Sequence, residues 1–258
     1  MPDTTAPPRL RSLEFHSPLS PERAQRLVDR LVDRLAPAEP STVLDVGSGW
    51  GALLLRLLDA APGATGVGID LNADDLARGR EIAGARGLSG RVEFAEESGI
   101  GTTRGPADVV LCVGSGHALT AAPGDFAGAL RELRRLVAPG GRVLYGEGFW
   151  QRTPTDDELA RMWPDAAAHD HFDLAGLVDL AVAAGFRPLW IETATEDEWE
   201  QFESGYQADL EEWLAANPAH PEAADLRERA DRHRASWLAG YRNILNMAYL
   251  TLVPVAEN

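Results

Sequence analysis

The sequence predicts an α/β protein, in which helices cover both faces of one doubly wound, mostly parallel sheet of seven strands. Short apolar runs alternate with helical segments from residue 42 onward, and this alternation is typical of parallel strands joined by crossover helices. The segment 108–113 contains an unbroken apolar run, as expected for a strand buried on both faces. The length of 258 residues and the hydrophobic content of 45% favour a single domain with one sizeable core.

The region ahead of the sheet is predicted to be a tail followed by one helix. Residues 1–12 contain three prolines and no apolar core, so we expect a flexible tail before a domain that spans 13–258. Ser20-Pro21-Glu22 combines a capping hydroxyl, a proline suited to the first helical turn and a carboxylate near the positive end of the helix dipole. Apolar residues recur at helical spacing over 27–35. We therefore expect an amphipathic helix that covers the sheet.

The strands are expected to be short and to alternate with helices that end near residues 60, 86, 137 and 184. Their predicted ranges are 43–46, 64–69, 92–95, 108–113, 142–145, 188–191 and 248–253. The last two strands are separated by two long segments with helical periodicity, 195–217 and 220–245, and Asn217-Pro218 interrupts the chain between them. We therefore expect a helical hairpin, residues 195–246, inserted between the last two strands as a lid.

The composition excludes several classes of function. The chain has 40 acidic and 24 basic residues, a net charge of −16, and every basic residue is arginine. Without lysine there is no Schiff-base chemistry and no P-loop. The negative charge disfavours nucleic acid as a partner. Cys112 is the only cysteine, which excludes an intrachain disulfide and favours a reducing compartment. With no signal-peptide or membrane-span pattern, we expect a cytoplasmic protein that acts on small molecules and does not bind membranes.

The strongest motif is a glycine turn that follows the first predicted strand. Residues 43–51 read Val-Leu-Asp-Val-Gly-Ser-Gly-Trp-Gly, and glycines at such a turn let a ligand approach the backbone closely. Asp45 precedes the first glycine by two residues. A carboxylate there would repel the pyrophosphate of a dinucleotide, but it suits a ligand with a positive amino-acid moiety. S-adenosylmethionine carries an ammonium, a sulfonium and no phosphate, so it fits this turn better than NAD does.

A second carboxylate, Asp70, ends the second predicted strand. In that position it can accept hydrogen bonds from both hydroxyls of a ribose. NAD-dependent enzymes share this feature, so Asp70 alone does not distinguish the two cofactors, and an NAD-dependent oxidoreductase remains an alternative. The spacing in Gly49-Trp50-Gly51 differs from the two-residue spacing of a dinucleotide loop, which argues against that alternative.

Taken with these residues, the chain resembles the class I S-adenosylmethionine-dependent methyltransferases over about residues 40–195. The resemblance is carried by 45–49, 68–70 and 136–141, the last of which reads Leu-Val-Ala-Pro-Gly-Gly. Phe15-His16-Ser17-Pro18 and the Trp-rich helical ending are similar to a poorly characterised bacterial subgroup of small-molecule methyltransferases. The resemblance implies a Rossmann-like fold and S-adenosyl-L-methionine as cofactor.

The family pattern also implies roles for individual residues. The glycine turn is expected to hold the methionine part of the cofactor, Asp70 the ribose, and Leu71 the adenine ring. An acidic residue usually accepts a hydrogen bond from the adenine amino group, but here that position falls on Ser98, one residue after Glu97. The expected cofactor-binding residues are Asp45, Gly47, Ser48, Gly49, Gly51, Asp70, Leu71, Glu97, Ser98 and Gly114.

Few residues qualify as a catalytic base. His117 follows the fourth predicted strand, and Glu147 ends the fifth; both are expected at the carboxyl edge of the sheet, where α/β proteins bind ligands. The alternatives are a loop histidine with structural hydrogen bonds and an exposed carboxylate. His16 precedes the first helix, where it either contacts the substrate or packs within the N-terminal segment. His169-Asp170-His171 with Asp173 could suggest a metal site, but alternate residues of a loop diverge and no further ligands are evident, so we expect none.

Aromatic residues follow one stripe on each helix of the predicted hairpin. Such stripes commonly dock helices, but a hairpin beside the binding edge can also cover a substrate. We assign Tyr206, Trp237 and Tyr241 to an aromatic wall of the substrate site, and Trp150 as a further substrate residue. If the substrate is cationic, the wall would also attract it through cation–π contacts. The sequence thus predicts a methyltransferase that modifies a nitrogen or oxygen atom of a small metabolite. A non-catalytic S-adenosylmethionine-binding protein is a further alternative.

Overall fold

The computed structural model describes residues 9–33, 35 and 41–256. Seven strands form one sheet in the order β3-β2-β1-β4-β5-β7-β6, and β7 is antiparallel to both of its neighbours. The predicted Rossmann-like, mostly parallel fold is therefore confirmed. The strands are β1 Ser41–Val46, β2 Ala64–Asp70, β3 Val92–Glu96, β4 Ala107–Val113, β5 Val137–Trp150, β6 Phe186–Thr193 and β7 Leu245–Pro254.

The longer helices lie close to the predicted ranges, and three short helical elements, α5, η1 and η2, were not predicted. The helices are α1 Pro21–Val32, α2 Ala52–Ala60, α3 Ala73–Ala85, α4 Phe126–Leu136, α5 Asp156–Leu159, α6 Leu174–Ala183, α7 Glu196–Ala216 and α8 Ala223–Ser236. Short helical turns follow at η1 Gly116–Leu119 and η2 Ala168–Asp170, and α8 continues into a π-helical turn, η3 Trp237–Tyr241. In the described part of the chain no helix has the length and apolarity needed to cross a membrane.

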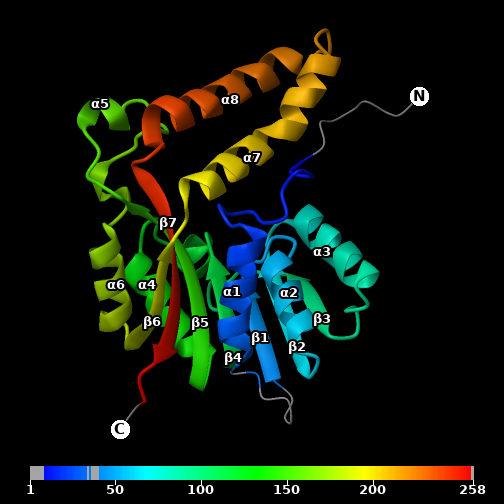
Figure 1. Ribbon diagram of the computed structural model, residues 1–258, viewed down its shortest axis with the longest axis vertical. Helices are drawn as coiled ribbons and strands as arrows, with labels where there is room; N and C mark the ends of the chain where they lie inside the picture. Colours follow the sequence, from blue (N-terminus) through cyan, green and yellow to red (C-terminus); the bar gives the residue numbers. More distant parts are fainter. Residues whose placement is uncertain (1–8, 34, 36–40, 257–258) are drawn as a thin grey trace.

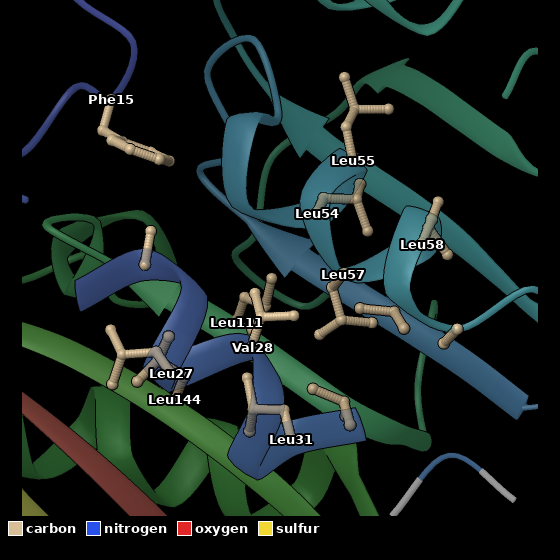
Figure 2. Close-up of a cluster of buried hydrophobic side chains, with 14 of the residues drawn as sticks. Phe15, Leu27, Val28, Leu31, Leu54, Leu55, Leu57, Leu58, Leu111 and Leu144 are labelled. Carbon is tan, nitrogen blue, oxygen red and sulfur yellow. The ribbon is translucent and has the colours of Figure 1, made fainter. Parts of the chain in front are cut away.

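Two apolar layers hold the helices to the sheet. On one face, leucines of α1 and α2 pack over strand residues that include Leu111 and Leu144, as Figure 2 shows. On the other face, α4 and α6 pack over the alternate strand residues, among them Leu44 and Val110. Because successive strand residues point to opposite faces, β1 and β4 contribute to both layers. This rigid support positions the loops at the strand ends.

The N-terminal segment, residues 9–20, packs against the domain, so it does not form a free tail. Leu10 is buried, Arg9 pairs with Asp75 at 3.0 Å, and the Arg11 amide donates to Asp209. The expected flexible tail over 1–12 is therefore corrected for residues 9–12, whereas 1–8 lie outside the described residues. Figure 1 shows this segment passing below α7 before it enters α1.

Glu198 ties α1 to the start of α7. Its carboxylate accepts hydrogen bonds from the Ser20 hydroxyl at 2.7 Å, the Arg23 Nε at 2.8 Å and the Thr195 amide at 2.8 Å. The pKa of Glu198 is lowered to about 2, because these donors outweigh the cost of desolvation. Glu198 thereby holds together the N-terminal ends of α1 and α7, which border the carboxyl edge of the sheet.

α7 and α8 occupy the sequence between β6 and β7, and they lie across the carboxyl end of the parallel strands (Figure 1). The predicted aromatic stripe of α7 divides into two parts. Trp213 packs with Leu214 against Leu226 and Ala230 of α8, whereas Trp199 and other residues of the first half face the sheet edge. The second helix ends earlier than predicted, because α8 passes into the π-helical turn at Trp237.

Candidate active site

A cavity of about 640 Å³, called the main cleft below, lies at the carboxyl edge of the sheet. It spans the boundary between β1 and β4, where the strand order reverses and where open α/β sheets bind ligands. The loops after β1, β2, β3 and β4 line one part of it. The rest is lined by the N-terminal segment and by Gly148, Leu245, Met247, Trp199 and Phe202.

The glycine turn forms the floor of the main cleft. The amides of Gly47 and Ser48 donate to the Ile69 carbonyl at 2.9 and 3.0 Å, which bends the chain beneath the cleft. Gly49 has a φ of +54°, and a Cβ atom at this position would meet nothing within 4 Å. Its backbone is therefore open to a ligand. Gly47, Ser48 and Gly49 all line the cleft.

Gly51 does not line the cleft, contrary to the sequence prediction. It caps α2 with a φ of +66°, and a Cβ atom here would lie 2.5 Å from the Phe94 ring. This glycine is needed for the left-handed cap and for the packing of Phe94. Its role is structural, which the spacing of the motif could not distinguish from ligand contact.

Asp45 lines the main cleft with an unsatisfied carboxyl group. The side chain is 6% exposed, and none of the described residues donates a hydrogen bond to it. Burial raises the pKa of Asp45 to about 7, and the nearby charge of Asp70 adds to this effect. A buried carboxyl without a partner is costly, so this group is suited to a cationic ligand.

Asp70 lies beside it at the end of β2, also in the lining of the cleft. One carboxylate oxygen accepts from the Gly49 amide at 2.8 Å, and the other accepts from the Asn72 amide at 2.8 Å. Each oxygen has a second lone pair available. Asp70 therefore orients the glycine turn and can still accept hydrogen bonds from a diol.

The loops after β2, β3 and β4 complete this half of the cleft. Leu71 and Ile100 line it and are 72% and 51% exposed, which leaves two apolar surfaces for a flat ring. The carboxylate of Glu97 accepts from Thr102 at 2.8 Å and Arg104 at 2.9 Å, and these bonds lower its pKa. Ser98 accepts from the Ile100 amide at 3.2 Å, so its hydroxyl proton is available to a ligand. Gly114, with a φ of +68°, also lines the cleft.

Two histidines also line the main cleft. His117 lies on the short turn η1 and is exposed to the cleft, and no described residue forms a hydrogen bond with its ring. His16 stacks on Trp50 with ring centroids 5.4 Å apart and lies 6.2 Å from Tyr206. Removal from water lowers the pKa of His16. Both rings are thus accessible to a ligand in the cleft.

Glu147 does not reach the main cleft, which corrects its assignment as a catalytic candidate. Its carboxyl accepts a hydrogen bond from the Tyr145 hydroxyl at 3.0 Å and from the Gly148 amide at 3.0 Å. Burial raises the pKa of Glu147. The carboxyl group of Glu147 therefore packs against Gly116 and is bonded to the Gly148 amide, away from the main cleft.

The predicted aromatic wall is divided between three places. Trp150 is 4% exposed and stacks on Trp163 with centroids 6.0 Å apart, so it belongs to the core. Tyr206 stacks on His233 and does not line the cleft. Trp237 and Tyr241 line a second, smaller cavity. The main cleft is instead bordered by Trp199 and Phe202, two aromatic residues from the first half of α7.

The His-Asp-His segment has structural contacts. His171 lies 3.2 Å from the Gly148 carbonyl through its Nδ1 atom, and its ring meets Trp150 edge-on at 4.9 Å. Asp170 accepts from the Ala167 amide at 2.9 Å. Within the described ranges, no group of three His, Cys, Asp or Glu residues has a geometry that could hold a metal ion.

A doubly wound sheet with a glycine turn and two carboxylates at its switch point is typical of enzymes that bind a nucleoside cofactor. Asp45 lies close to where a dinucleotide would place its pyrophosphate, so its carboxylate disfavours a dinucleotide. A family model described as a methyltransferase domain matches residues 44–143. An uncharacterized Escherichia coli protein, YjhP, is 31% identical over 215 residues, which is 83% of each chain.

Two solved structures are similar over nearly the whole chain. An S-adenosylmethionine-dependent methyltransferase from Geobacter sulfurreducens, in complex with S-adenosylhomocysteine, has a TM-score of 0.80 at 27% identity and covers 96% of this chain and 98% of its own. Another from Thiobacillus denitrificans, with the same ligand, has a TM-score of 0.80 at 27% identity and covers 93% and 94%. The chain belongs to the class I S-adenosylmethionine-dependent methyltransferase family, and S-adenosylmethionine is its cofactor. This finding supports methyltransferase activity over the NAD-dependent and non-catalytic alternatives.

Proposed function

We propose that the main cleft binds S-adenosylmethionine and that the enzyme methylates a nitrogen or oxygen atom of a small metabolite. The observation that carries this proposal is the buried, unpaired carboxyl of Asp45 beside the open backbone of Gly49. A ligand that brings an ammonium group to this point removes the desolvation cost of Asp45, and a phosphate would increase it.

The rest of the cofactor follows the order of the strands. Asp70 accepts the ribose hydroxyls, and the adenine ring lies between the apolar side chains of Leu71 and Ile100, with Ser98 beside it. At the position where the family commonly has an acidic residue for the adenine amino group this chain has Ser98, and the neighbouring Glu97 is already held by Arg104. Ser98 or a backbone carbonyl takes its place.

The acceptor occupies the half of the main cleft formed by β4, β5 and β7. When bound, the cofactor would supply a methyl group attached to a sulfonium. The lone pair of the acceptor atom would form the new bond to the methyl carbon, and the electrons of the broken C–S bond would stay on sulfur. Val113, Met247, Trp199 and Phe202 exclude water from this half. His117 accepts the proton that the acceptor loses. The N-terminal segment and the helices within 195–246 cover the cleft as a lid.

Replacement of Asp70 by alanine is expected to weaken the binding of S-adenosylhomocysteine by about 1.5–3 kcal/mol, which is roughly 10- to 150-fold. The change removes the acceptor for the ribose and the tie to the Gly49 amide. Titration calorimetry on the full chain measures this effect. Asp74→Ala is the matched control, since this neighbouring carboxylate is exposed and lies outside the cleft. If wild-type protein gives no heat with S-adenosylhomocysteine, the proposed site is wrong.

Replacement of His117 by alanine is expected to lower kcat by on the order of 10²-fold or more, with unchanged affinity for S-adenosylhomocysteine. Production of S-adenosylhomocysteine from panels of amines, phenols and alcohols measures the rate. Substitution of the exposed His169, which lies outside the cleft, is the control. A His117 variant with full kcat on the acceptor that wild type methylates would remove His117 from the mechanism.

A further inference from the structure

A second cavity of about 210 Å³, called the aromatic pocket below, adjoins the acceptor half of the main cleft. Trp199 and Leu245 line both cavities, so these two side chains form the boundary between them. In the sheet order the cofactor half lies over β3, β2 and β1, and the acceptor half over β4, β5 and β7. The aromatic pocket follows next, because Gln151, Leu245 and Asn246 adjoin the paired ends of β5 and β7. It is therefore on the side opposite the adenine end.

The aromatic pocket is built from an unusual backbone. η3 is a π-helical turn in which the Arg242 amide donates to the Trp237 carbonyl at 3.0 Å, and Asn243 follows with a φ of +61°. Both conformations are rare and occur often at functional sites. Together they direct Trp237 and Tyr241 toward the same cavity.

Hydrogen bonds to buried groups orient the rings that line this pocket. The Tyr241 hydroxyl donates to Glu203 at 2.7 Å, and Glu203 is 2% exposed. The Trp199 Nε1 donates to the Asn246 Oδ1 at 2.7 Å, and Asn246 is 5% exposed. The rings of Trp199 and Tyr241 lie 6.3 Å apart at 60°. The pocket is thus organised before a ligand arrives.

The charges around both cavities oppose an anionic acceptor. Among the described residues, Arg242 is the only cationic side chain that lines the aromatic pocket, and it already pairs with Glu196 and Glu200 at 2.8 and 2.5 Å. In the main cleft, Arg9 is the only arginine that the described part of the chain contributes to the lining, and it pairs with Asp75. A carboxylate on the acceptor would therefore be buried without a cationic partner, at a large cost. An ammonium would meet aromatic faces and an excess of carboxylates.

We propose that the aromatic pocket holds the body of the acceptor, that this acceptor is an amine on a compact apolar or aromatic body, and that its nitrogen reaches the acceptor half of the main cleft at the Trp199–Leu245 boundary. The proposal rests on the proposed function and names the acceptor class for it. The amine enters as a cation and, at the Trp199–Leu245 boundary, gives one proton to His117, the base proposed above. Its nitrogen then forms a bond to the methyl carbon as the C–S bond breaks, and the electron pair remains on sulfur.

The test uses the full chain saturated with S-adenosylhomocysteine and three probes that share one ring: phenethylamine, 2-phenylethanol and phenylacetate. Calorimetry is expected to show that phenethylamine binds at least tenfold more tightly than phenylacetate, with 2-phenylethanol between them. Equal or tighter binding of phenylacetate, or no binding of phenethylamine to the loaded protein, would overturn the amine assignment. Absence of S-adenosylhomocysteine binding would instead show that the proposed function itself has failed.

Variants locate the probe in the pocket. Trp237→Leu is expected to weaken phenethylamine binding by about 3- to 30-fold, the range of a cation–π contact, and to leave S-adenosylhomocysteine binding within twofold of wild type. Trp237→Phe keeps an aromatic face and should recover most of the affinity, which a purely structural role would not require. Trp190→Leu on the exposed edge strand β6 is the control. Unchanged phenethylamine binding in Trp237→Leu would contradict the pocket assignment.

Discussion

Replacement of Asp45 by asparagine is expected to reduce the affinity for S-adenosylmethionine by about 2–5 kcal/mol, which is roughly 30- to 5,000-fold. The substitution keeps the size of the side chain and removes the buried charge that we assign to the ammonium group. Calorimetry with S-adenosylhomocysteine, which carries the same ammonium group, measures the loss. Asp59→Asn is the control, because Asp59 forms an exposed ion pair with Arg86. Unaltered affinity in the Asp45 variant would show that the ammonium group lies elsewhere.

The same residue predicts a pH dependence of binding. With the pKa of Asp45 raised to about 7 in the free enzyme, the carboxyl is increasingly protonated below pH 7, and a cationic ligand must displace that proton. The affinity of wild type for S-adenosylhomocysteine should therefore fall by up to tenfold per unit as the pH drops from 7 to 6. Asp45→Asn should remove this slope. A wild-type affinity that is constant from pH 8 to pH 6 would contradict the prediction.

Asp45→Asn is also expected to stabilise the ligand-free protein. The folded-state pKa lies above the unfolded value of 3.8, so the folded state binds the proton more tightly. The contribution of Asp45 to stability is thus most favourable below about pH 4, declines between pH 4 and pH 7, and is unfavourable above pH 7. At pH 8 the free energy of unfolding of the variant should exceed that of wild type by on the order of 4 kcal/mol. Urea denaturation at pH 8 and pH 5 measures both values, and the difference should shrink at pH 5.

Replacement of Glu198 by glutamine is expected to lower the free energy of unfolding by about 3 kcal/mol. Glu198 and Arg23 form an ion pair in which both side chains are buried: Glu198 is 5% exposed and Arg23 is 8% exposed. Removal of one partner leaves the other charge without its main counterion. Urea denaturation at pH 7 measures the loss. Glu211→Gln is the control and should change stability by less than about 1 kcal/mol, because its ion pair with Arg234 is exposed.

The carboxylate of Glu198 also predicts an acid transition. Its folded-state pKa is lowered to about 2 from the usual 4.5, so its stabilising contribution is complete above pH 4.5 and is lost as the pH falls through 2. The difference in stability between wild type and Glu198→Gln should therefore shrink from pH 5 to pH 2. A difference that stays constant over this range would show that the pair does not act through charge. Because Glu198 joins α1 to α7, the variant should also loosen the cover of the main cleft.

Most of the fold could be predicted because the signals are local. The apolar segments that become β1 to β4 are bounded by turn residues, and their predicted limits differ from the structure by at most two residues. β5 is longer than predicted, since it begins at Val137 and pairs with β7 as far as Trp150. Pairing with the antiparallel strand β7 extends its end to Trp150, and pairing with Ala107 of β4 sets its start at Val137. Both partners are distant in the sequence, so the residues of β5 alone do not carry that information.

For the candidate site, the sequence correctly indicated the residues of the glycine turn and the two carboxylates at the strand ends. The turn at Gly47 and Gly49 and the carboxylates Asp45 and Asp70 all line the main cleft. Glu147 has an equally suggestive position at a strand end, but its side chain turns into the interior toward Tyr145. Which face a residue at a strand end presents to a cleft depends on twist and on neighbouring loops, and one sequence does not settle it.

By itself, the sequence determined the α/β architecture, the family and the cofactor, because periodicity and a turn motif depend on residues that are close along the chain. Only the tertiary structure decided which aromatic residues meet the main cleft. The stripe on α7 divides after Phe202, and Trp237 and Tyr241 are carried away by the π-helical turn to a second cavity. The two groups of aromatic residues separate because α7 and η3 pack against strands that are distant from them in the sequence. Their placement therefore depends on tertiary packing and not on the helical repeat.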